Sequence, residues 1–134
     1  MNNINTVLSF LKECGVFYLA TTDNGLPKVR PFGIIDLIDG HLYMVTLKRK
    51  DVYKQIVANP QIQLCAMKSD GTWIRVNGHA VSIDDSAIKQ QLLAINPTTQ
   101  EIYANCINEM IALRIDNGCA SISTDNPNPI CFNF

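Results

Sequence analysis

Long apolar runs are missing from this chain of 134 residues. A helix that spans a membrane needs about 20 consecutive, mostly apolar residues, and the chain has no such run. Its first residues lack a basic start and place Lys12 and Glu13 inside their apolar pattern, which argues against a secretory signal. We therefore expect a cytoplasmic protein with no membrane partner.

Closely spaced cysteines are also missing. The chain has five, which is an odd number, and no CxxC pair: Cys14, Cys65, Cys106, Cys119 and Cys131. Disulfide frameworks and zinc sites usually show closer pairing. The two histidines, His41 and His79, lie far apart in the sequence and fit no metal-ligand spacing. We expect buried free thiols in a reducing compartment and no metal site.

Positive charge is scarce and concentrated. With 11 Lys and Arg against 12 Asp and Glu, the chain has a net charge of -1, whereas a nucleic-acid-binding protein usually has a broad basic surface. Six of the basic residues nevertheless lie between positions 28 and 54: Lys28, Arg30, Lys48, Arg49, Lys50 and Lys54. This concentration predicts a local anion site and no nucleic-acid partner.

Short strand-like segments joined by turns dominate the chain, and its composition fits one folded domain over residues 1–134. Strands are expected at 16–22, 28–36, 42–46, 61–67, 72–83, 110–115 and 119–123. Four helices are expected: one capped by Asn3 or Asn5 and ended by Gly15, one at 51–59, one capped by Asp84 or Asp85 that runs to about 95, and one opened by a capping box at Thr98. The segment 116–118 predicts a hairpin turn between the last two strands. About seven strands with three or four short helices predict a mainly β fold, an antiparallel sheet closed or nearly closed into a barrel.

The segment from Thr46 to Val52 follows an apolar run and stands where a strand is expected to end and a helix to begin. Backbone N–H groups and the helix dipole favour an anion at such a point, and the lysines, the arginine and the Thr46 hydroxyl add to it. The segment therefore favours a phosphate site. The alternative is a solvated basic face with no ligand.

Two further strands carry side chains that suit a ligand. Pro31 lacks a ladder donor and predicts an edge, bulged or bent strand, while Arg30 could bind phosphate through two hydrogen bonds. Within the expected strand 72–83, alternate residues put Trp73, Arg75, Asn77 and His79 on one face. That face suits a polar ligand, a wet subunit interface or plain solvent. No Walker loop, nucleophile elbow or carboxylate pair is present, so we assign no catalytic residue.

Taken in order, three segments resemble the pyridoxamine 5′-phosphate oxidase-like family, the FMN-binding split barrels. They are FYLATTDNGLPKVRPFG, HLYMVTLKRKDVYKQIVANPQIQL and GTWIRVNGHAV. The resemblance covers about residues 7–115 and is greatest to the short, single-domain nitroimidazole-resistance (Nim-like) members. It implies an antiparallel split β-barrel and a homodimer with FMN at the subunit interface. Small-molecule electron donors and acceptors would be its other partners.

The resemblance also implies residues that hold FMN. Arg30, Pro31 and Phe32 match the strand along the flavin, with Arg30 reaching the phosphate or the ribityl chain. Val45 and Thr46 match a strand-end pair beside the cofactor.

The remaining implied cofactor residues lie further along the chain. Arg49 and Lys50 match the basic pair that grips the phosphate. Trp73 falls where larger oxidases place a polar residue near the ring, and Lys48 and Gln55 are nearby candidates.

One departure from the family pattern limits the expected activity. True pyridoxamine phosphate oxidases end in a segment with substrate-binding arginine and histidine, whereas this chain ends in residues 126–134 without either. Vitamin B6 oxidation is therefore not expected, and an FMN-dependent oxidoreductase is the leading interpretation. The alternatives are a non-catalytic protein that binds or senses a flavin or another cofactor, and a purely structural dimer.

Overall fold

The computed structural model describes residues 2–124 and 128–134. Within these residues, eight strands form one antiparallel sheet with the order β2-β1-β5-β6-β7-β4-β3, and β8 pairs with β7. In chain order the elements are α1 (Asn3–Cys14), β1 (Phe17–Asp23), β2 (Leu26–Phe32), β3 (Asp36–Ile38), β4 (His41–Leu47), α2 (Asp51–Ala58), β5 (Gln61–Met67), β6 (Trp73–Ile83), α3 (Ser86–Ile95), α4 (Pro97–Tyr103), the 3-10 helix η1 (Ala104–Cys106), β7 (Met110–Ser123) and β8 (Ile130–Asn133). The prediction of a mainly β, antiparallel fold with short helices is confirmed.

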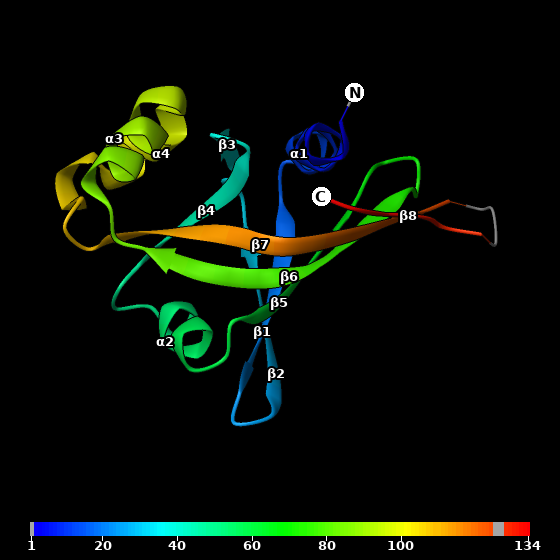
Figure 1. Cartoon of the computed structure of the whole chain (residues 1–134), viewed down its shortest axis with the longest axis horizontal. Helices are drawn as coiled ribbons and strands as arrows, with labels where there is room; N and C mark the ends of the chain where they lie inside the picture. The colour runs from blue at the N-terminus through cyan, green and yellow to red at the C-terminus, as the bar shows by residue number, and fades with distance from the viewer. Residues whose placement is uncertain (1, 125–127) are drawn as a thin grey trace.

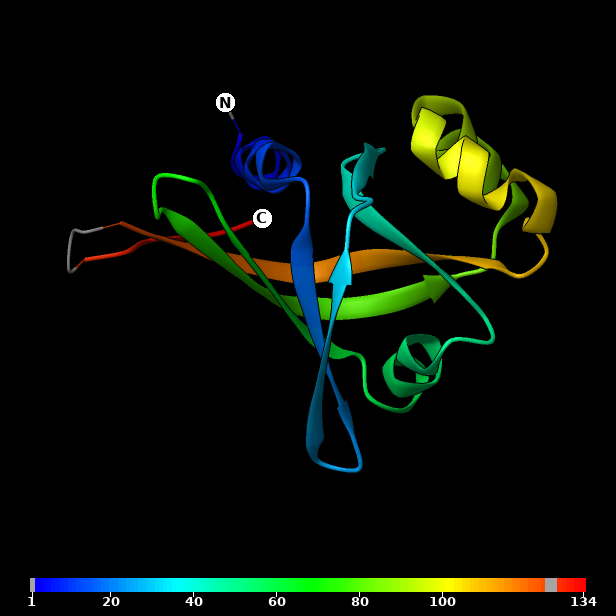
Figure 2. The same ribbon diagram turned by 180° about the vertical axis from the view of Figure 1, so that it is seen from behind.

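The arrangement in space brings distant parts of the chain together. Strands β6 and β7 run side by side across the molecule, and the β1–β2 hairpin crosses them (Figure 1). Helices α3 and α4 stand together beyond one end of the β6–β7 pair, and α2 lies between that end and the hairpin (Figure 2). As a result, α2, α4 and β2 lie on the same side of the molecule.

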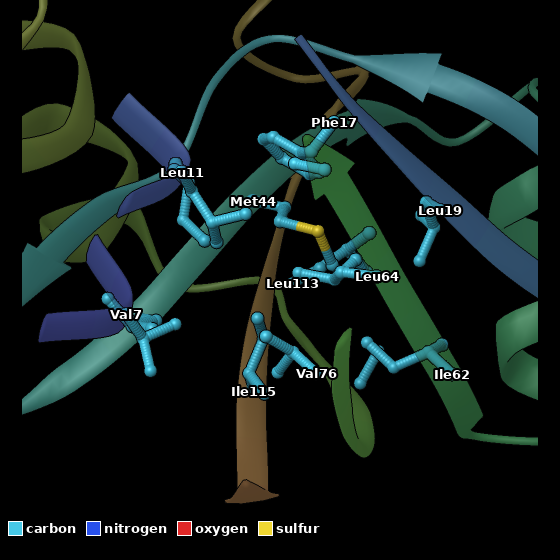
Figure 3. Packing of buried hydrophobic residues seen from close by; sticks show 14 of the residues in the cluster. Val7, Leu11, Phe17, Leu19, Met44, Ile62, Leu64, Val76, Leu113 and Ile115 are labelled. Carbon is cyan, nitrogen blue, oxygen red and sulfur yellow. The ribbon is translucent and has the colours of Figure 1, made fainter. Parts of the chain in front are cut away.

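The core explains why these elements pack in this way. Helix α1 places Val7 and Leu11 against Phe17 and Met44 inside the curved sheet (Figure 3). A second buried cluster lies where Leu92 of α3 meets β3, β4 and the start of β7. Burial of a large aliphatic side chain stabilises a fold by about 1.5–3 kcal/mol, so each cluster fixes the helices above it. The second cluster fixes α3 and α4 beside β4.

Two helices are capped by residues other than those predicted. The cap of α1 is Asn2, whose side chain accepts a hydrogen bond from the Asn5 N–H, so neither Asn3 nor Asn5 is the cap. Helix α4 begins at Pro97 and is capped by Asn96, so the cap expected at Thr98 lies two residues too late. Proline suits the first helical position because its missing N–H would have no partner there. The Gly15 end of α1 and the Asp85 cap of α3 are as predicted.

The predicted strand 28–36 is two strands. Strand β2 ends at Phe32 and pairs with β1 alone, whereas β3 starts at Asp36 and pairs with β4. The intervening residues carry the chain from one edge of the sheet to the other, and two of them, Ile34 and Ile35, are buried. Pro31 therefore lies on an edge strand, as its missing N–H predicted.

The predicted hairpin at 116–118 is wrong, because β7 continues through it as one strand. On β6 the step from Asn77 to His79 covers two residues, while their partners Cys119 and Asp116 are three apart. One extra residue on β7 makes this a β-bulge, with Asn117 at φ 54°. The Asn-Gly pair that favours a tight turn also suits the left-handed residue of a bulge, and cross-strand pairing on both sides selected the bulge.

The end of the chain forms a strand that the sequence did not predict. Strand β8 pairs with β7, and the ring of Phe134 packs directly over Gly118. Residues 126 and 127 of the predicted tail lie outside the described residues. The five cysteines are free, as expected, but the expectation that they are buried is wrong, since Cys119 and Cys131 are exposed and the others are half-buried. No helix in the described part of the chain is long and apolar enough to cross a membrane.

Candidate functional site: a groove along the edge strand β2

A groove of about 770 Å³ runs along β2. Its floor and walls come from β2 and the residues that follow it, the end of β4, the start of α2, and α4. The lining residues are Asp23, Lys28, Val29, Arg30, Pro31, Phe32, Gly33, Ile34, Thr46, Lys50, Asp51, Val52, Gln55, Thr98, Ile102 and Tyr103. Ligand pockets commonly span about 300–1,000 Å³, so this groove has room for a molecule the size of a nucleotide.

A closed triangle of hydrogen bonds holds Arg30 in the groove wall. One terminal nitrogen of its guanidinium donates to Thr21 Oγ1 at 2.8 Å and to the Leu19 carbonyl, and the other donates to Gln55 Oε1 at 2.7 Å. The Thr21 hydroxyl also donates to Gln55 Oε1. Thr21 and Gln55 are buried. Three of the five N–H donors of Arg30 are thus used among the described residues, and two are left for a ligand.

The start of α2 forms the opposite wall. Lys50 is the N-cap of α2 with an extended backbone, and its side chain makes no capping hydrogen bond. Its ammonium group takes part in no ion pair among the described residues, while its side chain lines the groove. Thr46 precedes this helix, near the end of β4. It is buried and also lines the groove. The first N–H groups of a helix have no partner within the helix, so this wall offers hydrogen-bond donors.

Cations outnumber acids in this part of the groove. Lys28, Arg30 and Lys50 line it together with Asp23 and Asp51. Burial lowers the pKa of the Arg30 guanidinium, and the Asp51 carboxylate opposes that shift, so Arg30 remains charged at neutral pH. The β2–α2 side can therefore bind an anion that is partly balanced by the two carboxylates.

The far side of the groove is different in chemistry. Ile34, Ile102 and Tyr103 give it an apolar surface, and Thr98 adds one hydroxyl. Burial raises the pKa of the Tyr103 phenol, and the nearby Cys106 thiol acts in the same direction, so Tyr103 is a neutral donor at pH 7.

The predicted cofactor residues are brought together only in part. Six of the ten line the groove: Arg30, Pro31, Phe32, Thr46, Lys50 and Gln55. Val45 is buried in the second core cluster, and Lys48 forms an ion pair with Asp84 at 3.1 Å. Arg49 is exposed in the turn before α2 and contacts no described residue through a hydrogen bond or ion pair.

Trp73 lies at the distant end of β6, where it pairs with Met67 and stacks against the Arg75 guanidinium at 4.9 Å. It belongs to the outer face of the sheet, which points away from the core. On this face Tyr18 of β1 is 51% exposed, Val29 of β2 is 68% exposed and Met67 is 64% exposed. The outer face and the groove meet along β2, because Val29 belongs to both.

The sequence missed several lining residues. Lys28 lies two residues before Arg30 on β2, so both side chains are on the same face of the strand. Its place in the groove could therefore have been predicted from the sequence. No sequence pattern pointed to Thr98, Ile102 or Tyr103, because the excursion between β6 and β7 reaches the groove only through tertiary packing.

Comparison with known proteins agrees with this fold. The profile of the pyridoxamine 5′-phosphate oxidase family matches residues 5–126. A solved NimC/NimA family protein from Clostridium acetobutylicum is 33% identical, with a TM-score of 0.92 over 97% of this chain and 91% of that chain. No curated protein matches the chain.

Two more distant solved structures share the fold. General stress protein 26 from Bacillus anthracis is 18% identical, with a TM-score of 0.76 over 100% of both chains. A pyridoxamine 5′-phosphate oxidase-related, FMN-binding protein from Nostoc punctiforme is 15% identical, with a TM-score of 0.65 over 100% of this chain and 98% of that chain.

Fold and groove together define an antiparallel split barrel with a cation-lined groove at its edge strand. The chain belongs to the pyridoxamine 5′-phosphate oxidase family, and its similarity to the clostridial protein covers nearly the whole chain. The family resemblance read from the sequence is confirmed.

Proposed function

We propose that this protein binds FMN in the β2 groove and acts as an FMN-dependent oxidoreductase. The observation that carries the proposal is the groove itself, in which Lys28, Arg30 and Lys50 supply positive charge, and Pro31 and Phe32 of β2 supply apolar surface. FMN suits both features, since a dianionic phosphate is joined through a ribityl chain to a flat, uncharged aromatic ring system. The FMN-binding relative from Nostoc supports a flavin, and a more distant split barrel from Mesorhizobium loti binds FAD.

The donors present in the groove fit the phosphate. Lys50 and Lys28 supply positive charge. The guanidinium of Arg30 is planar, so its two remaining N–H groups can donate to two phosphate oxygens. The Thr46 hydroxyl adds one donor, and Phe32 and Pro31 offer apolar surface for the ring. Val45, Lys48, Arg49 and Trp73 have no place in this arrangement within a single chain.

Bound FMN would supply the redox chemistry, accepting a hydride from a small-molecule donor and returning two electrons to an acceptor. The chain's own residues bind and orient. Arg30 is fixed by Thr21 and Gln55 before any ligand arrives, so little side-chain entropy is lost on binding. The groove lining of a single chain includes no histidine or cysteine, so we assign it no acid or base.

The outer face supports a homodimer as part of the same proposal. Tyr18, Val29 and Met67 expose apolar side chains there, beside the polar Arg75 and Asn77. Exposed apolar groups rimmed by polar ones are typical of a protein interface. Because the groove opens along β2 into this face, a second copy would complete the wall around FMN and bring its own Trp73 face close to it.

The test is direct. Freshly purified protein should show flavin absorbance, and flavin-free protein should bind FMN more than tenfold tighter than riboflavin, which lacks the phosphate. No flavin absorbance together with no thermal shift from FMN at micromolar concentration would defeat the proposal. Sedimentation equilibrium tests the dimer: Met67→Glu should yield monomers, while Val57→Glu, at an equally exposed apolar residue of α2, should not.

A second candidate function is a protein that binds or senses a flavin without turnover. The lining near Tyr103 favours it because it has no charged side chain that could take part in a reaction. Oxidation of NADH or NADPH by the FMN-loaded protein, with a quinone as acceptor, separates the two functions. Steady turnover supports the oxidoreductase, and tight FMN binding with no turnover of any donor supports the sensor.

A further inference from the structure

The α4 side of the groove has no place for a second anion. Between positions 84 and 109 the only lysine or arginine is Lys89. Its side chain is buried, and its ammonium group contacts Asp84 and donates to the Ile107 carbonyl at 3.3 Å. Lys48 pairs with the same Asp84 at 3.1 Å, so this carboxylate holds both lysines.

Tyr103 gives the same side one directional feature. It lines the groove, and its hydroxyl makes no hydrogen bond with any described residue. The phenol O–H can therefore donate to an acceptor on a ligand that enters the groove. Ile34 and Ile102 flank it with apolar surface.

This wall is held in place before any ligand binds. Asn96, the cap of α4, donates to Asp36 Oδ2 at 2.9 Å, and Lys12 of α1 contacts Asp36 Oδ1 at 2.7 Å. Asp36 is buried on β3, so these contacts tie the start of α4 to the sheet and to α1. Such a clamp holds the start of α4 against β3 before any ligand binds, as a preorganised subsite requires.

We propose that the α4 side of the groove is the subsite for the second substrate, and that it selects a neutral, mostly apolar molecule with a hydrogen-bond acceptor placed at Tyr103. The inference rests on the proposed function, because all three groove cations are then occupied by the FMN phosphate. Tyr103 is the specificity-determining residue. A phosphorylated or carboxylated substrate would lie against Ile34 and Ile102 without a partner for its charge.

The experiment uses a matched pair of unreactive probes, 2-acetylnaphthalene and 6-acetyl-2-naphthoate, titrated calorimetrically into the FMN-loaded protein. The two differ only in a carboxylate. We expect the neutral ketone to bind at least tenfold tighter. Tyr103→Phe should weaken the ketone about fivefold, the effect of one lost hydrogen bond, while the control Tyr53→Phe, on α2 outside the lining, should not.

A second variant tests the charge rule without touching the core. Ile102 is 54% exposed, so Ile102→Lys should fold normally and should reverse the preference toward the carboxylate. Equal or tighter binding of the carboxylate by the unaltered protein, or a ketone affinity indifferent to Tyr103→Phe, would overturn the inference. A protein that binds FMN but no ketone overturns the subsite alone, whereas one that binds no FMN overturns the proposed function on which it rests.

Discussion

Arg30 and Gln55 meet across the groove wall, where the guanidinium donates to Gln55 Oε1 at 2.7 Å. The two residues come from β2 and α2, and Thr21 of β1 closes the triangle. The contact ties the hairpin to the helix and sets the position of the charge that the proposed phosphate would meet.

Gln55→Leu should destabilise the protein. The buried Thr21 hydroxyl and the Arg30 guanidinium would each lose an acceptor, and a buried group left unpaired costs about 1–3 kcal/mol. Urea unfolding should show a loss of that size. Gln63→Leu, which breaks an exposed contact with Asn77, is the control and should change stability far less. Equal losses would mean that the triangle contributes nothing of its own.

Lys50→Ala should weaken FMN binding without lowering stability. Its ammonium has no ion pair among the described residues, so a charge-assisted bond to phosphate worth about 1–3 kcal/mol is lost only in the complex. Fluorescence titration with FMN measures the change, and Lys54→Ala removes the same charge one helical turn later, outside the lining. If both variants bind FMN equally, general electrostatics and not a contact at Lys50 is responsible.

Asp36→Ala should loosen α4. The substitution removes the acceptor for Asn96 and the partner of Lys12, so the first turn of α4 loses its tie to β3. Hydrogen–deuterium exchange should become faster over residues 96–103. Glu101→Gln, a surface change on α4 itself, should leave exchange as it was. Unchanged exchange in Asp36→Ala would show that apolar packing alone holds the helix.

Asp116 should make stability depend on pH in the acid range. Hydrogen bonds from Arg114 lower the pKa of Asp116, with the charges of Arg114, His41 and His79 acting in the same direction and desolvation opposing them. Because the folded pKa lies below the unfolded value of about 3.9, the stabilisation is present above the unfolded pKa and is lost as pH falls through the folded pKa. Melting temperatures between pH 2.5 and 6 should fall more steeply for the natural protein than for Asp116→Asn. Parallel curves would contradict the assignment.

Gly118→Ala should detach the C-terminal ring. A Cβ at Gly118 would come within 2.3 Å of the Phe134 ring, so the ring must leave its place. We expect a loss of about 1–2 kcal/mol, part of the burial of one aromatic side chain. In a double-mutant cycle measured by urea unfolding, Phe134→Ala should remove most of the effect of Gly118→Ala. Additive effects would place the strain elsewhere.

Much of the fold could be predicted because local chemistry and tertiary structure agree. Alternation along β1 buries Phe17, Leu19 and Thr21, and the Asn24-Gly25 turn has the positive φ angles that its residues favour. Prediction failed where one local signal serves two structures, as at Asn117, whose left-handed backbone suits either a turn or a bulge.

The site divides in the same way. Arg30 and Lys50 stood out because strand ends, helix starts and clustered charge are visible in sequence. Tyr103 and Ile102 were not found, since an apolar residue on a short helix looks the same whether it faces a core or a groove. Trp73 was assigned by resemblance, and its side chain lies on the outer face at the far end of β6.

The bulge in β7 makes the length of the chain at this point as important as its composition. With the extra residue, Ala120 and Ile122 point into the core while Cys119 and Ser121 point outward, in phase with β6. Loss of a single residue at 117 or 118 would exchange these two sets and carry the error into β8. A substitution at these positions changes the stability of the fold by a limited amount. A one-residue deletion would move the core side chains at the end of the barrel to its outer face.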